Sequence, residues 1–202
     1  MRQPKATSFL GAQPCGKRLP CTPVSKPPEI HADCVAWART AGFRCETDES
    51  TDTLILRHDG GAPVRYFIRH RGARLELRQA SDDGDERIVL FAADETVLSV
   101  FLYGMFGDDI RDDLDLPFLE LPWAITDLAH GYTLSDMTRG YRILSRVGAG
   151  PLAAAPDATL SLLTLVPLSQ LLSLPSVDAL RRSFLSEAGT PLLVDGRYAL
   201  HK

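Results

Sequence analysis

A chain of 202 residues is long enough for one folded domain with a single core, and 45% of its residues are hydrophobic. The formal net charge of −4 provides no overall attraction to nucleic acid or to anionic membranes, and no apolar run is long enough to cross a bilayer. These totals exclude a membrane-spanning protein and disfavour a nucleic-acid binder.

The first 28 residues are rich in proline and glycine, and all their charged side chains are basic. This composition predicts a disordered tail, followed by a single domain over residues 29–202. The tail has no continuous apolar core of the length that a secretory signal needs. We therefore expect a cytoplasmic protein, and the tail itself could be an artefact of the assigned start site.

The first half of the domain has the pattern of one helix followed by a meander of strands. Apolar side chains of Ile30–Ala41 fall on one side of a helix, and Gly42 follows as a natural end. Turn residues such as Asp59–Gly61 and Ser81–Asp85 separate the strand-like runs. These runs are Thr53–Arg57, Val64–Arg71, Arg74–Gln79 and Glu86–Phe91. Their short connections predict antiparallel pairing.

Alternation along these runs gives the predicted sheet one apolar face and one face rich in arginine. Ile68 points to the first face, whereas Arg69 and Arg71 point to the second. A basic face could bind phosphate or nucleic acid, but its arginines could equally pair across strands with Glu76 and Glu86. The acidic total favours pairing.

The segment Asp94–Trp123 joins the most apolar predicted helix to the most acidic predicted loop. Asp94 is a good N-cap for a helix that is expected to run to Phe106, and Gly107 supplies its end. The loop that follows has one base, Arg111. Its acids are Asp108, Asp109, Asp112, Asp113, Asp115 and Glu120.

Prolines and aromatic residues beside these acids predict a loop that is held against the body of the protein. They are Pro117, Phe118, Pro122 and Trp123. The carboxylates could bind a divalent metal, although the spacing is not that of a calcium loop, or act as general acid and base if one were buried. The loop could also be merely solvated, or present a negative surface to the basic cleft of a partner protein.

Beyond Trp123 the pattern is weaker. Strands are predicted at Tyr132–Asp136 and Tyr141–Arg146, and a loop of small residues at Gly148–Pro156. The segment Ala158–Leu174 is rich in leucine, but Pro167 lies in its middle. A short strand and then a helical turn are expected there, rather than one helix.

The C-terminal segment has clear local signals. Ser176 is a good N-cap for a helix to Leu185, and Leu192–Val194 and Tyr198–Leu200 flank a turn typical of a hairpin. The complete pattern predicts the α+β class, with an antiparallel sheet built from meander hairpins and packed with a few amphipathic helices.

Recognisable catalytic patterns are absent from the sequence. The phosphate-binding patterns G-x-G-x-x-G and G-x-x-x-x-G-K-[ST] do not occur, nor do H-E-x-x-H and G-x-S-x-G. The histidines lie apart in the sequence, and the cysteines lack the close pairs of structural zinc sites. These residues are His31, His58, His70, His130 and His201, and Cys15, Cys21, Cys34 and Cys45. We predict reduced thiols and no catalytic residue, cofactor or metal.

The most distinctive run is LYGMFGDDIRDDLDLPFLELPW at Leu102–Trp123, which combines an aromatic-glycine stretch, an Ile-Arg-acid turn and proline-bracketed apolar steps. The other runs are CVAWARTAGF (Cys34–Phe43), VRYFIR (Val64–Arg69), HGYTLSDMTRGYRIL (His130–Leu144), and SVDALRRSFL with PLLVDGRYAL (Ser176–Leu200). Together they resemble a family of bacterial immunity proteins, the one that contains the immunity factor for the tuberculosis necrotizing toxin. The resemblance covers about Ile30 to Leu200.

This resemblance implies a non-catalytic cytoplasmic antitoxin that binds a secreted NAD glycohydrolase toxin domain and blocks its active site. It implies no cofactor, nucleic-acid or membrane partner, and a monomer before the complex forms. Our hypothesis places acids at the rim of the interface and an aromatic residue at its core. The proposed contacts are Asp108, Asp109, Arg111, Asp112, Asp113, Asp115, Phe118 and Trp123. The alternative is a small-ligand-binding protein or enzyme that uses the acidic 108–120 loop.

Overall fold

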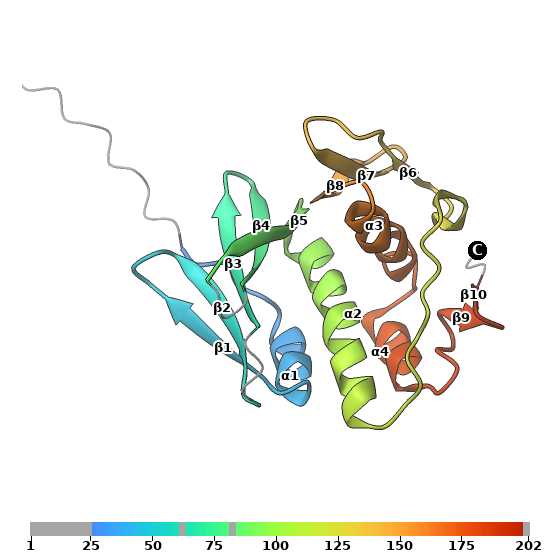
Figure 1. Ribbon diagram of the computed structural model, residues 1–202, viewed down its shortest axis with the longest axis horizontal. Helices are drawn as coiled ribbons and strands as arrows, with labels where there is room; N and C mark the ends of the chain where they lie inside the picture. The colour runs from blue at the N-terminus through green and yellow to red at the C-terminus, as the bar shows by residue number, and fades with distance from the viewer. Residues whose placement is uncertain (1–25, 61–63, 81–83, 200–202) are drawn as a thin grey trace, which may run out of the picture.

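Residues 26–60, 64–80 and 84–199 are described in the computed structural model of the chain (Figure 1). Within these ranges, an eight-stranded antiparallel sheet is covered by four α-helices, and a short hairpin lies near the C-terminal end. This arrangement confirms the α+β class. The predicted tail up to residue 25, and the turn residues 61 and 81–83, lie outside the described residues.

The sheet consists of two groups of strands that meet at one seam. The first group is the predicted meander: β1 (Phe43–Asp48), β2 (Thr53–His58), β3 (Arg65–Arg71), β4 (Arg74–Ala80) and β5 (Glu86–Ala92). The second group is β6 (Tyr132–Leu134), β7 (Tyr141–Arg146) and β8 (Gly150–Pro156). The spatial order is β1-β2-β3-β4-β5-β8-β7-β6. At the seam, β5 pairs with β8 through Phe91 with Ala154 and Ala92 with Ala153, and the Ala93 amide next to them donates to the Leu152 carbonyl at 2.7 Å.

The longest helix occupies the centre of the molecule. The helices are α1 (Ala32–Thr40), α2 (Glu95–Asp113), α3 (Leu160–Leu171) and α4 (Val177–Leu185), with a 3-10 turn η1 (Ile125–Asp127). In Figure 1, α2 runs steeply between α1 on one side and α3 and α4 on the other. As predicted, the Asp94 carboxylate caps α2 and accepts from the Val97 amide at 2.9 Å. Leu98, Leu102 and Phe106 of α2 are fully buried, so this helix joins the sheet to the other helices in one core.

The helix α2 is longer than predicted, because Gly107 does not end it. Gly107 lies inside the helix and faces Phe184 of α4, where a Cβ atom would stand 2.4 Å from the ring. The chain leaves the helix at Leu114, and Asp115 then takes a left-handed φ of 52°, which aspartate tolerates better than most residues. The acidic loop predicted from residue 108 is therefore wrong, and Asp108–Asp113 form the last turns of α2.

The predicted break at Pro167 is also wrong, because α3 passes through this residue. A proline inside a helix removes one backbone hydrogen bond and costs about 3 kcal/mol. Against that, α3 buries Leu165, Val166, Leu168 and Leu171. Each fully buried aliphatic side chain contributes about 1.5–3 kcal/mol, so the packing outweighs the proline.

Two strands, β1 and β8, were not predicted. β1 has the sequence FRCETD, in which charged residues hide the alternation of buried and exposed side chains. β8, with the sequence GPLAAAP, was predicted as a loop because its residues are small. It packs against α3, and Ala153 and Ala155 are buried there. Their small side chains allow the close approach of helix and strand, which is a tertiary effect.

The remaining elements follow the predictions closely. Ser176 caps α4 by accepting from the Ala179 amide at 3.1 Å, and the closing hairpin forms from β9 (Leu193–Val194) and β10 (Arg197–Tyr198). Gly42 follows α1 with a φ of 75°. Across the described ranges, no helix combines the length and the apolar character needed to cross a membrane.

Candidate functional site at the acidic end of α2

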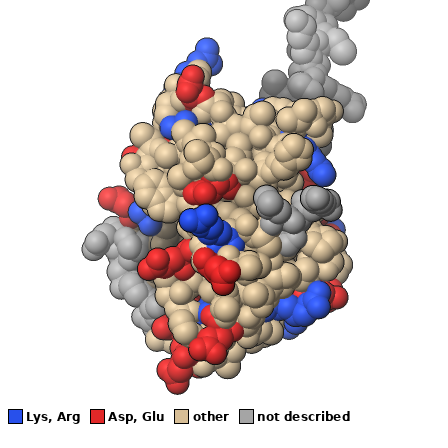
Figure 2. Space-filling model, turned by 90° about the vertical axis from the view of Figure 1, so that its right-hand side faces the viewer, with Lys and Arg blue, Asp and Glu red and all other residues tan. Residues whose placement is uncertain are grey.

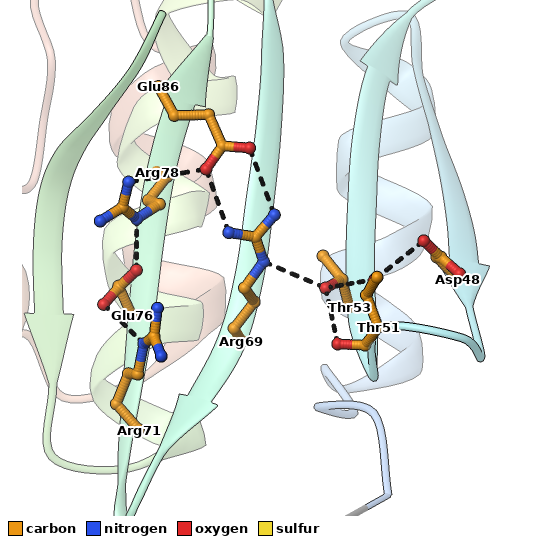
Figure 3. A network of polar contacts seen from close by, with 8 residues as sticks. All are labelled: Asp48, Thr51, Thr53, Arg69, Arg71, Glu76, Arg78 and Glu86. Carbon is orange, nitrogen blue, oxygen red and sulfur yellow. Dashed lines mark hydrogen bonds and ion pairs between the residues drawn. The ribbon is translucent and has the colours of Figure 1, made fainter.

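The arginine-rich face of the sheet carries a network of ion pairs (Figure 3). Glu76 is only 3% exposed and accepts from Arg71, at 3.0 Å, and from Arg78. Burial favours the neutral form of Glu76, but hydrogen bonds from Arg78 and Arg71 outweigh it and hold its pKa below the usual value. Arg69 pairs with Glu86 at 3.0 Å. The predicted pairing across strands is confirmed, and these arginines do not form an open phosphate-binding surface.

The acids at the end of α2 leave the helix in different directions. Asp108 lines a groove that α2 shares with α3. Asp109 lies on the side of the sheet. Burial raises its pKa above the usual value, although nearby His58 acts in the opposite direction. Asp112 and Asp113 are exposed. The helix therefore divides the acids that were predicted to form one cluster.

Arg111 lies inside the protein, with 1% of its side chain exposed. Its guanidinium donates to backbone carbonyls on both sides of it. These carbonyls belong to Pro117, Phe184, Ser186 and Glu187. Arg111 thus joins α2 to the segment that follows it and to the end of α4. Its predicted place on a partner-binding surface is corrected, because the guanidinium cannot reach a partner.

The segment between α2 and η1 is held against the body of the protein, as predicted, but by different residues. Arg111 holds the Pro117 carbonyl, and Leu119 is buried against Gly189. The Tyr198 hydroxyl donates to the Pro122 carbonyl at 2.8 Å. The aromatic residues that were expected to hold the segment, Phe118 and Trp123, instead stand 76% and 46% exposed.

A groove of about 670 Å³ lies between α2, α3 and this segment. Its acidic side chains are Asp108 and Glu120. Most of the lining is apolar and includes Phe101, Met105, Leu121, Trp123, Leu163 and Leu168. The residues that α2 and α3 contribute to this lining were not predicted from the sequence. The spacing of three and four residues from Phe101 to Met105 and Asp108 could have indicated this face of α2.

Asp108 is the acid in an unusual environment. Its Oδ1 is buried and accepts no hydrogen bond from any described residue. Burial and the neighbouring charge of Asp109 raise the pKa of Asp108 to about 6, with Arg111 acting in the opposite direction. At neutral pH the groove therefore contains an ionised carboxylate whose Oδ1 has no hydrogen-bond donor among the described residues.

The family model described as Immunity protein 61 matches residues 37–192, which include the eight-stranded sheet, all of α2 and every lining residue of the groove except Gly196. The chain belongs to the Imm61 family of immunity proteins.

Individual relatives agree with this assignment. The Imm61 chain is 27% identical over 169 residues to the "Immunity factor for TNT" of Mycobacterium tuberculosis, and equally to the "Immunity factor for TNT homolog" of Mycobacterium bovis. Each alignment covers 81% of this chain and 92% of the relative. The solved structure of Rv3902c from M. tuberculosis superposes with a TM-score of 0.71 at 27% identity, over 81% and 92% of the two chains. The family resemblance seen in the sequence is thereby confirmed.

The described part of this Imm61 protein contains no group of three or more His, Cys, Asp or Glu side chains arranged to hold a metal ion. Cys34 and Cys45 are free thiols, and burial raises the pKa of Cys34 to about 12. Cys15 and Cys21 lie outside the described residues.

The variant Asp108→Asn is expected to raise the free energy of unfolding of this Imm61 protein by about 1–2 kcal/mol at pH 7, because it removes a buried charge. The pKa of Asp108 is higher in the folded state than its ordinary value of 3.8. The folded chain therefore binds more protons between about pH 4 and pH 6, and stability from this group falls as pH rises through that window.

Urea unfolding of both proteins at pH 4.5 and pH 7 measures this effect. Comparing the two proteins at each pH isolates the effect of Asp108, because its charged neighbours Asp109, Arg111 and Glu120 are present in both. Asp113→Asn, at an exposed acid on the same helix, is the matched control, with an expected change within about 0.5 kcal/mol. An Asp108→Asn variant that is less stable than the wild type at pH 7 would contradict the argument.

Proposed function

We propose that this chain is a non-catalytic antitoxin that binds the NAD glycohydrolase domain of a TNT-type toxin in the cytoplasm. The monomeric chain blocks the active site of the toxin in a one-to-one complex. The observation that supports this is the similarity to a relative named an immunity factor for TNT, which extends over 92% of that relative. Because the alignment covers nearly the whole relative, the part of the relative that acts as an immunity factor lies within the aligned region.

Such a role requires tight binding. A free hydrolase that turns over about 10 substrate molecules per second would drain a shared cofactor pool, so the antitoxin must hold it at nanomolar affinity, or about −12 kcal/mol. An interface of about 800 Å² per partner supplies this where an aromatic anchor lies within a polar rim. Exposed Phe118 and Trp123, together with exposed Asp112 and Asp113, provide both kinds of residue within one short segment of the chain.

The proposal predicts the outcome of a titration. Addition of the purified chain to the catalytic domain of its cognate TNT-type toxin is expected to abolish NAD hydrolysis at a one-to-one ratio. Heat-denatured chain is the control, and it should leave hydrolysis unchanged. Undiminished hydrolysis with excess folded chain, or NAD hydrolysis by the chain alone, would overturn the proposed function.

A further inference from the structure

The groove beside α2 is surrounded by large apolar side chains that stand in solvent. Phe118 and Trp123 border it from the segment after α2, and Leu163, 43% exposed, borders it from α3. Exposed apolar residues around one hollow are typical of surfaces that become covered in a complex. Large aromatic residues in such places are also the side chains that most often dominate binding.

The charged part of the groove is acidic. Asp108 and Glu120 belong to its lining, and no lysine or arginine of the described residues does. Exposed Asp112, Asp113 and Asp115 continue the negative charge from the end of α2. Figure 2 shows acidic side chains gathered at the lower end of this side of the molecule, at the height where α2 ends in Figure 1. A basic occupant meets complementary charge here, whereas an acidic one is repelled.

The buried oxygen of Asp108 indicates where a positive group belongs. Oδ1 accepts no hydrogen bond from the described residues, and a buried carboxylate oxygen without a donor is unfavourable. Asp108 as a whole is only partly buried and lines the groove, so an arginine or lysine placed in the groove brings the opposite charge next to this carboxylate.

On the basis of the function proposed above, we propose that this groove is the docking site for the toxin domain. Its occupant is an apolar side chain of the toxin next to an arginine or lysine that pairs with Asp108. A protein segment fits the groove better than a small molecule, because Phe118 borders the hollow yet is 76% exposed, and only a surface that extends beyond the hollow covers the whole ring. A protein surface covers the hollow and Phe118 together, and excludes water from the pair at Asp108.

Two variants of the full chain test this site against the toxin catalytic domain used above. Leu163→Asp places a charge in the apolar border, and its dissociation constant is expected to rise by about 100-fold or more. Asp108→Asn removes the charge that pairs with the toxin, and a rise of about 10–100-fold is expected. The control is Val147→Asp, at a 68% exposed position in the turn between β7 and β8, with a change within about threefold.

The design separates loss of binding from loss of fold. Asp108→Asn is expected to stabilise the free chain, so weaker binding by this variant cannot result from unfolding. Thermal unfolding of Leu163→Asp shows whether that variant remains folded.

The outcomes also separate the two proposals. Wild-type binding with both groove variants within threefold of it would overturn the docking site and leave the proposed function standing. A wild-type chain that neither binds nor inhibits the toxin would overturn the function itself. Self-association of the free chain that Leu163→Asp abolishes would assign the groove to a second copy, and overturn the toxin as its occupant.

Discussion

Arg111→Ala is expected to lower the free energy of unfolding by about 3–5 kcal/mol, a large part of the total for a domain of this size. The substitution leaves the carbonyls of Pro117, Phe184, Ser186 and Glu187 without their donor in the interior. It also releases the segment that follows α2 from the end of α4. Urea unfolding followed by circular dichroism measures the loss, as a lower midpoint with an unchanged slope.

Two further variants show whether geometry or charge is responsible. Arg111→Lys keeps the charge but replaces a planar group of five donors with a single ammonium, so most of the loss should remain. Arg182→Ala, at an exposed position on α4, is expected to change stability by less than about 0.5 kcal/mol. If Arg111→Lys were as stable as the wild type, the carbonyl network would not be what holds these segments.

Gly107→Ala is expected to destabilise the protein by about 2–3 kcal/mol, although alanine is the better helix former by about 1 kcal/mol. The new Cβ would lie 2.4 and 2.5 Å from two ring atoms of Phe184, which is fully buried. The ring cannot move without displacing its neighbours, so α2 and α4 must separate. Thermal and urea unfolding would both record the loss.

A second glycine on the same helix is the matched control. At Gly104 an added Cβ would stand 2.7 Å from the Cδ1 atom of Leu171, but 3.8 Å from Cζ of Phe184, which is an ordinary contact distance. The end of a leucine side chain can rotate away, and the gain in helix propensity offsets the cost, so Gly104→Ala should change stability by less than about 1 kcal/mol. Equal effects at both positions would show that contact with the Phe184 ring is not the cause.

Local patterns predicted the elements whose signals are local. The strands β2 to β5 lie where strand-like runs are separated by turn residues, and Asp94 and Ser176 cap the helices that they were expected to cap. The two wrong helix ends have another origin. Gly107 and Pro167 are helix-ending residues by their own chemistry, and the burial that overrides them depends on packing against distant parts of the chain.

The candidate site was predicted in outline only. The segment 108–123 does border the groove, but the helix divides its acids, and their roles differ from those that composition suggested. Three of the four carbonyls that Arg111 binds lie at or just after the end of α4, far along the chain, so no nearby pattern could indicate its burial. The groove needs α3 as one continuous helix, and Pro167 argued against that in the sequence. Consequently, the environment of Asp108 could be recognised only in the folded chain.

The seam between β5 and β8 gives α2 an additional role. Since two residue pairs join the groups of strands, backbone pairing alone fixes their mutual angle poorly. The packing of α2 fixes it instead: the Phe106 ring lies 4.9 Å from that of Phe43 on β1, and α2 packs against α3, which in turn packs against β7 and β8. The single helix α2 therefore sets the relative orientation of the two groups of strands. Its acidic C-terminal end is held in a fixed position at the surface by the same packing.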